Sequence, residues 1–253
     1  MKIFTDKKNI ARLLSVVLAI VIWQIVAMRV NQAMLLASPI EVFKRFFSLI
    51  GETEFLSTVA FSFGRISLGF VIAFVLGIIF GIIAGKISVI ESLLWPYVTF
   101  VKTVPVASFI ILCLIWFDIS YLSIIIAFLM SFPIVYTNVL TGMRSTDKKM
   151  KEMATIYNVP SGKQIIYIYM PSVKPYILSA ANIGIGMAWK AGVTAEIIGM
   201  TDGSIGDMLY QTKVYFQNAD LLCWTIVIII ASVLSEKVFV AFLKLLFKGG
   251  ERL

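Results

Sequence analysis

The stretch KKMKEMATIYNVPSGKQIIYIYMPSVKP, from Lys148 to Pro175, is the only long segment of the chain that is polar, basic and clearly patterned. Apolar runs of membrane-spanning length lie on both sides of it. A charged and patterned loop held between two spans usually presents a surface to something in the water. The stretch therefore predicts an integral membrane protein with a structured loop outside the bilayer.

The first half of this loop reads as a short helix. Asp147 is suited to cap its N-terminus, and the helix is expected to run from Lys148 to about Tyr157. Asn158 then tolerates the left-handed conformation that helix ends often need. Val159-Pro160 prevents simple continuation, because proline has no N–H and restricts the residue before it.

A second helix is expected from about Ser161 to Tyr169, ending at Met170-Pro171. On the first helix, apolar residues recur at three- and four-residue spacing and share one face: Met150, Met153, Ala154 and Tyr157. Methionine is flexible and suits a contact surface. The loop is thus expected to end in an apolar knob that contacts a partner, with a solvated loop packed on its own protein as the alternative.

The run Glu152-Met153-Ala154, followed by Asn158 and Ile168-Tyr169-Met170-Pro171, resembles the EAA loop of ABC-importer permease subunits. Asn158 stands six residues after Glu152, where that family has glycine. Met153 replaces alanine and Met170 replaces leucine, and every spacing fits. Asn158 preserves the backbone logic, since asparagine is the next-best residue for a left-handed turn.

The resemblance extends to nearly the whole chain from Leu35. Further stretches resemble the nitrate, sulfonate and taurine branch of these permeases: residues 36–39, 65–85, 102–117 and 188–199. In that family the loop docks as a coupling helix on a separate ATPase subunit. The coupling residues so implied are Met150, Glu152, Met153, Ala154, Tyr157, Asn158, Val159, Pro160 and Ser161.

The same resemblance implies the partners. They are two ABC ATPase subunits that bind ATP and Mg, a second permease copy forming a homodimer, and an extracytoplasmic solute-binding protein. No cofactor is expected in this chain. The solute would be small and anionic or zwitterionic, such as nitrate, a sulfonate, taurine or a vitamin precursor.

Composition supports the membrane class independently. The chain has 253 residues, of which 60% are hydrophobic and 14% charged, whereas soluble domains are about half apolar and about a quarter charged. We expect one transmembrane domain over residues 1–253, with a cytoplasmic loop at 144–175. The net charge is +8, and the lysine and arginine residues that carry it lie between the apolar runs. They form no basic recognition patch, so a nucleic-acid partner is not expected.

Six transmembrane helices are predicted, giving an all-α membrane protein with a five-helix core and an N-terminal helix. The expected spans are 13–28, 63–85, 97–117, 119–140, 176–199 and 221–240, with an irregular entry to the third span at 102–105. An amphipathic helix from Pro39, with Ser38 and Glu41 as its capping box, is expected on the outer face, with a solvated helix of an external loop as the equal alternative, and 86–96 is expected to form a short inner connection. Lysine and arginine concentrate on one set of flanks, which places both termini in the cytoplasm of a cell (plasma or inner) membrane protein.

The second span carries a small residue at every fourth position: Gly69, Ala73, Gly77, Gly81 and Gly85. Such stripes let helix backbones approach closely in lipid. We expect a tight helix contact there, either inside the subunit or at a dimer interface. Permissive glycine in an apolar helix is the alternative.

The fifth span is the most polar. Asn182, Gly186, Trp189, Val193 and Glu196 follow one another at three- and four-residue steps and are expected to face the protein interior or a water-filled path. Lys190 lies too far around the helix to pair with Glu196, so each needs another partner. The predicted translocation-pathway residues are Asn182, Gly186, Trp189, Lys190 and Glu196.

The sequence predicts no catalytic, nucleotide-binding or metal site in this chain. Neither Gly-Lys pair completes a nucleotide-binding loop, the chain has no histidine, and Cys113 and Cys223 lie in apolar runs, so neither an enzyme nor a metal site is predicted. The leading hypothesis is the permease subunit of an ATP-driven importer. An ion-coupled secondary transporter or channel, and a membrane scaffold, are the alternatives.

Overall fold

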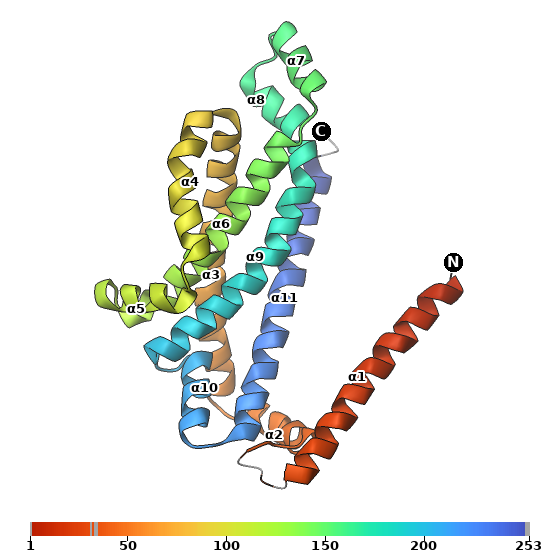
Figure 1. Ribbon diagram of the computed structural model, residues 1–253, viewed down its shortest axis with the longest axis vertical. Helices are drawn as coiled ribbons and strands as arrows, with labels where there is room; N and C mark the ends of the chain where they lie inside the picture. Colours follow the sequence, from red (N-terminus) through yellow and green to blue (C-terminus); the bar gives the residue numbers. More distant parts are fainter. Residues whose placement is uncertain (1, 31, 33–34, 251–253) are drawn as a thin grey trace.

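The structure is a computed structural model that describes residues 2–30, 32 and 35–250 (Figure 1). In the described residues the elements, in chain order, are α1 (Lys2–Val30), α2 (Pro39–Ile50), α3 (Phe55–Lys86), α4 (Ser88–Thr103), α5 (Val106–Trp116), η1 (Ile119–Tyr121), α6 (Leu122–Arg144), α7 (Lys148–Ile156), α8 (Ser161–Gln164), η2 (Ile165–Tyr169), α9 (Met170–Gly199), α10 (Ile205–Val214) and α11 (Asn218–Gly250).

Four long helices, α3, α6, α9 and α11, form the bundle, with α6 packed between α3 and α9 (Figure 1). The α7–α8 segment projects beyond one end of the bundle, close to the C-terminus, and α10 and α2 lie at the other end. Helix α1 extends away from the bundle and contacts α2. At its junction, the indole Nε1 of Trp23 donates to the carbonyl oxygen of Ala37 at 3.1 Å.

Several of these helices match the dimensions of a bilayer. Within the described residues, three are long and apolar enough to cross it: α3, α11, and the run from Ile119 to Arg144 that joins η1 to α6. The bent pair α4–α5 would make a fourth, and the apolar part of α1, Leu14–Val30, is shorter. Helix α9 has the length, but it carries polar residues along one side. The chain is thus helical and multi-pass, and the count of six spans stays a prediction.

The third predicted span is irregular at residues 102–105, as expected, but the break divides it into two helices. Instead of one helix over 97–117, α4 and α5 meet at an angle of 106°, and α4 already begins at Ser88, inside the expected inner connection. The break lies at Val104, whose ψ of 134° is extended, and at Pro105. The cause is local, because a proline disfavours the helical conformation of the preceding residue.

The small-residue stripe of α3 lies against α6. A Cβ placed on Gly77 would stand 2.7 Å from the Cβ of Val135, and one on Gly81 would stand 2.7 Å from that of Val139. Gly69 lies against α6 in the same way, Gly85 would place a Cβ 2.6 Å from the Cβ of Met143, and Ala73 is fully buried. This close contact is therefore within the subunit.

The end of the bundle opposite α7 is held by charges. Ser38 and Glu41 form the predicted capping box of α2, which is confirmed. On the same helix, Arg45 forms an ion pair with Asp220 of α11 and a second one with Glu52, at 2.8 Å. The hydrogen bond from Arg45 to Asp220 raises the pKa of the guanidinium, so this residue stays charged and ties α2 to α11.

Candidate functional site

The α7 segment forms as predicted at both of its ends. The Asp147 carboxylate accepts a hydrogen bond of 2.9 Å from the backbone N–H of Lys149, which confirms the N-cap. At the other end Asn158 has a φ of 49°, the left-handed conformation expected of it. The N–H groups of Val159 and Asn158 then reach back to the carbonyls of Ala154 and Thr155, at 2.9 and 3.1 Å. This is the Schellman arrangement, which satisfies the last carbonyls of the helix.

The sequence predicted that the second helix of the loop ends at Met170-Pro171, and this prediction is wrong. Helix α8 passes through the π-helical turn η2 directly into α9. The N–H of Met170 bonds to the carbonyl of Ile165, five residues back. Proline is tolerated in a first helical turn, and Pro171 stands there in α9. The second half of the loop, from Ser161, and α9 therefore form one connected helical path.

The tip of α7 presents an exposed apolar surface. Met150 and Met153 are each 46% exposed, and Ile156 and Tyr157 are each 75% exposed. We call these four residues the α7 knob. Ala154, expected on the same face, is instead buried. Ile156 belongs to the knob, although the sequence pattern did not single it out.

Polar groups surround the knob and anchor it. The side chain of Glu152 is 60% exposed and lies 3.8 Å from the ammonium of Lys148. Lys151 donates to the carbonyl of Met143, at the end of α6, at 3.2 Å. The ammonium groups of Lys151 and Lys86 each lie 5.5 Å from the ring centroid of Tyr169. These contacts connect the loop to α3, α6 and η2, and they fix the position of α7 relative to these elements.

The sequence pattern predicts that the polar residues of α9 share one face, but in the structure they do not. Trp189, Val193 and Glu196 are buried within the subunit, whereas Asn182 and Lys190 are exposed. At Gly186 a Cβ would meet nothing within 4 Å, so this position is open. The outward stripe consists of Ser179, Asn182, Gly186, Lys190 and Thr194, of which Gly186 and Thr194 are half-buried. We call these five residues the α9 polar face.

Glu196 lies in a buried junction of three helices. Its carboxylate accepts hydrogen bonds from the Ser62 hydroxyl of α3 at 2.8 Å and from the backbone N–H of Gly206 at 3.3 Å. The Ser62 oxygen accepts in turn from the N–H of Ile205 at 2.9 Å. A carboxylate at the N-terminus of a helix is favoured by the helix dipole. Glu196 and Ser62 therefore hold the start of α10 against α3 and α9.

Gly206 permits this junction. A Cβ on Gly206 would collide with the side chain of Glu196 and would stand 2.6 Å from the backbone nitrogen of Ile197. Only glycine therefore lets α10 approach α9 so closely. Neither Ser62 nor Gly206 was predicted, because nothing in the local sequence connects them with Glu196.

Comparison with known proteins identifies the family. Residues 77–249 match the family described as binding-protein-dependent transport system inner membrane component. The chain is 29% identical to the aliphatic sulfonates transport permease protein of Bacillus subtilis, over 86% of this chain and 79% of that protein. It is 26% identical to the taurine transport system permease protein of Escherichia coli, over 87% and 82% of the two chains.

A third relative is named for a different class of compound. The chain is 25% identical to the formylaminopyrimidine transport permease protein of Halalkalibacterium halodurans, over 72% of this chain and 73% of that protein. The Bacillus subtilis and Escherichia coli relatives match the sulfonate and taurine branch suggested by the sequence motifs. The chain belongs to the family of inner-membrane permease components of binding-protein-dependent ABC transport systems.

Proposed function

We propose that this chain is the membrane-spanning subunit of an ATP-driven importer for a small solute, and that the α7 knob couples it to a separate ATPase subunit. The observation that carries the proposal is the knob itself. Its four apolar side chains are exposed, and α7, which carries them, projects beyond the end of the bundle (Figure 1). Exposed apolar patches rimmed by polar residues are typical of protein contact sites.

The backbone of the loop favours a mechanical role. The Schellman end of α7 and the contacts of Lys151 give the knob a defined geometry. The turn at residues 157–160 joins α7 to α8, and the path α8–η2–α9 then runs into the bundle without a further loop. A displacement imposed on the knob by a closing ATPase pair would therefore reach α9 directly. ATP would act by binding the closed ATPase pair more tightly than the open pair.

We propose the α9 polar face as part of the translocation pathway. A hydroxyl, an amide and an ammonium turned toward lipid would be costly, so this face must meet water or protein. A second copy of the chain, facing the first across its α9 helices, would enclose a polar path. Lys190 would be the cation of that path. Trp189 and Glu196 are left out of this proposal, because they are buried within one subunit.

The substrate class follows from the relatives and from Lys190. Two relatives are named for sulfonate compounds and one for a pyrimidine. An ammonium on the α9 polar face favours an anionic or zwitterionic solute, such as a sulfonate or taurine. We further propose that an extracytoplasmic binding protein delivers this solute to the end of the bundle that carries α10. The two termini and the α7 knob would then be cytoplasmic, as the distribution of lysine and arginine suggests.

The test is purification of the tagged chain from its native membrane in mild detergent, followed by mass spectrometry of the proteins that stay bound. We expect an ATPase subunit in stoichiometric amount. Tyr157→Glu should remove that subunit, because it places a charge in the centre of the apolar contact. The matched control is Tyr215→Glu, since Tyr215 is 68% exposed and follows α10 at the far end.

Two results would count against the proposal. One is a chain that purifies without an ATPase and still transports solute in vesicles, which would favour an ion-coupled transporter. The other is an ATPase that stays bound in Tyr157→Glu as firmly as in the control. Loss of the ATPase in Tyr157→Glu alone would support the α7 knob as the coupling site.

A further inference from the structure

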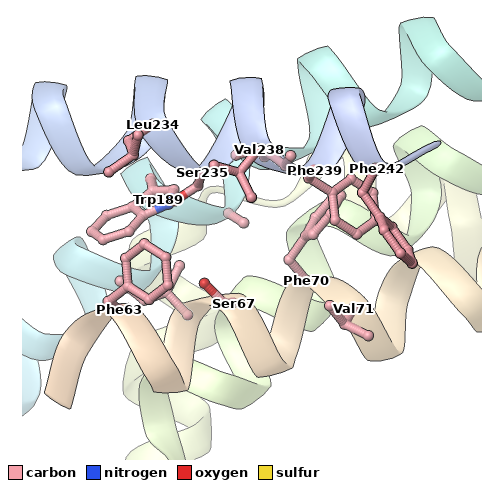
Figure 2. Close-up of a pocket in the computed structure, with 13 residues that line it drawn as sticks. Phe63, Ser67, Phe70, Val71, Trp189, Leu234, Ser235, Val238, Phe239 and Phe242 are labelled. Carbon is pink, nitrogen blue, oxygen red and sulfur yellow. Dashed lines mark hydrogen bonds between the residues drawn. The ribbon is translucent and has the colours of Figure 1, made fainter. Parts of the chain in front are cut away.

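An apolar cavity of about 500 Å³ lies between α3, α9 and α11 (Figure 2). Its size is within the range of about 300–1,000 Å³ found for small-molecule sites. Figure 2 shows α3 and α11 on its two sides, with Phe63, Trp189, Phe70 and Phe239 lying between them. Apolar and aromatic side chains of these three helices line it, and Ser67, Trp189 and Ser235 are the lining residues with a polar side-chain atom.

Aromatic contacts close both ends of the cavity. At one end Phe63 meets Trp189 edge to face, with ring centroids 5.9 Å apart. At the other end Phe70 of α3 meets Phe239 of α11 in the same manner, at 5.1 Å. Between these contacts, α3 and α11 are held apart (Figure 2). The space is therefore bounded by rigid side chains.

The indole N–H and the Ser235 hydroxyl in the cavity wall are already hydrogen-bonded within the protein. The Nε1 of Trp189 donates to the Ser235 hydroxyl at 3.1 Å, and that hydroxyl donates to the carbonyl of Ala231 at 2.6 Å. Ser67 supplies the remaining polar side chain of the lining. The lining has no charged or amide side chain. An anionic or zwitterionic solute would lose its hydration there without compensation. The cavity is therefore unsuited to the transported solute.

The mouth of the cavity faces the exterior of the bundle. Leu234, Val238 and Phe242 of α11 are each more than half exposed, and Val71 of α3 is exposed as well. In a membrane-spanning chain, the medium at such an apolar surface is the hydrocarbon of the lipids. An unfilled apolar cavity forfeits the dispersion contacts of its walls. An acyl chain entering from the bilayer would restore them.

We propose that this cavity binds the acyl chain of a membrane lipid. Its length decides how much of the lipid enters. The lining of α11 extends from Leu234 to Phe242, which is about 12 Å at a helical rise of about 1.5 Å per residue. That is less than half of the hydrocarbon thickness of about 30 Å. One segment of one chain fits, and the headgroup stays in the interface.

The site is separate from the α9 polar face. The cavity contacts α9 through Ile185, Ala188 and Trp189, whereas the α9 polar face includes Gly186 and Lys190. Successive residues of an α-helix are turned by about 100°, so these two sets lie on different faces. A lipid chain on one side of α9 and the solute path on another would share this helix without overlapping.

Fluorescence quenching by lipids with brominated acyl chains tests the proposal, using the complete complex reconstituted in bilayers. The signal of Trp189 is obtained by subtracting the signal of Trp189→Phe from that of the wild type. Trp189 is only 2% exposed, so a lipid chain reaches it best from inside the cavity. We expect strong quenching of Trp189 in bilayers of brominated phosphatidylcholine, compared with the same lipid without bromine.

A substitution that fills the cavity provides a second test of lipid binding. Ser67→Phe should abolish most of the quenching of Trp189, whereas Ile72→Phe, on the lipid-facing side of the same helix, should preserve it. Native mass spectrometry should show one phospholipid per chain retained in the wild type and lost in Ser67→Phe. An unquenched Trp189 would mean that protein covers the cavity, either α1 or a second copy, and would overturn the proposal. Equal quenching in Ser67→Phe would do the same.

Discussion

Ser62 and Glu196 are joined by a buried hydrogen bond of 2.8 Å, although 134 positions separate them in the chain. Both residues are fully buried. The bond links α3 to α9, and through the N–H groups of Ile205 and Gly206 it also holds α10. Because α9 begins at the coupling loop and ends beside this junction, α10 is fixed to the far end of the helix that starts near the α7 knob.

The junction should be sensitive to loss of one hydroxyl. Ser62→Ala removes the partner of the Ile205 N–H and one donor to Glu196, so the free energy of unfolding should fall by about 1–3 kcal/mol. Ser67→Ala on the same helix is the control and should change it little. Thermal unfolding of the purified protein in detergent measures both. Equal transition temperatures for the two variants would show that the bond adds no stability.

The left-handed conformation of Asn158 predicts how substitutions at this position rank in stability. Asn158→Gly should keep the end of α7, because glycine adopts a φ of 49° without strain. Asn158→Val should destabilise that end by about 1–2 kcal/mol, because a branched side chain disfavours the left-handed region. Limited proteolysis of the loop compares the two variants. Faster cleavage of the glycine variant than of the valine variant would contradict the Schellman account.

The contact of α3 with α6 leaves no room for larger side chains. Gly81→Leu would press on Val139 and should cost about 1–3 kcal/mol or prevent folding. At Gly64, on the same helix, a Cβ would meet nothing within 4 Å, so Gly64→Leu is the matched control. The yield of folded protein in size-exclusion chromatography measures both variants. Similar yields would show that α3 and α6 are not tightly packed.

The α9 polar face can be tested by transport. Lys190→Gln should lower ATP-dependent uptake by about tenfold, equivalent to about 1.4 kcal/mol, and leave the amount of assembled complex unchanged. The control is Ile183→Gln, also exposed on α9. Uptake of labelled taurine, an alkanesulfonate and a formylaminopyrimidine by cells with the complete system is the measurement. If Lys190→Gln transports the accepted compound normally, Lys190 lies outside the path.

Local signals in the sequence predicted local structure well. The capping box of Ser38 and Glu41, the cap at Asp147 and the left-handed turn at Asn158 each depend on residues within one helical turn. The family was equally accessible, because the motif around Glu152 has fixed spacing. The long helices followed from apolar runs, although their ends shifted by several residues.

Features that depend on distant contacts or on helix phase were missed. A proline was expected to end the loop at Pro171, but the π turn before it carries the helix onward. The stripe through Asn182 and Glu196 was right at Asn182 and Gly186 and wrong beyond them, because the outward line of α9 continues to Lys190 and Thr194, whereas Trp189 and Glu196 are buried. The partner of Glu196 lies on α3, and only the packing of the bundle brings Ser62 to it.

The most direct test of the coupling role is a cysteine crosslink from the α7 knob. Ile156→Cys, labelled in native membranes with a short thiol-reactive photocrosslinker and then illuminated, should give an adduct with the mass of this chain plus the ATPase subunit. Tyr215→Cys, at the other end of the bundle, should give none, and the native Cys113 and Cys223 are buried. An ATPase adduct from position 156 alone is the predicted result. No adduct from position 156 in membranes that carry out ATP-driven uptake would contradict the account.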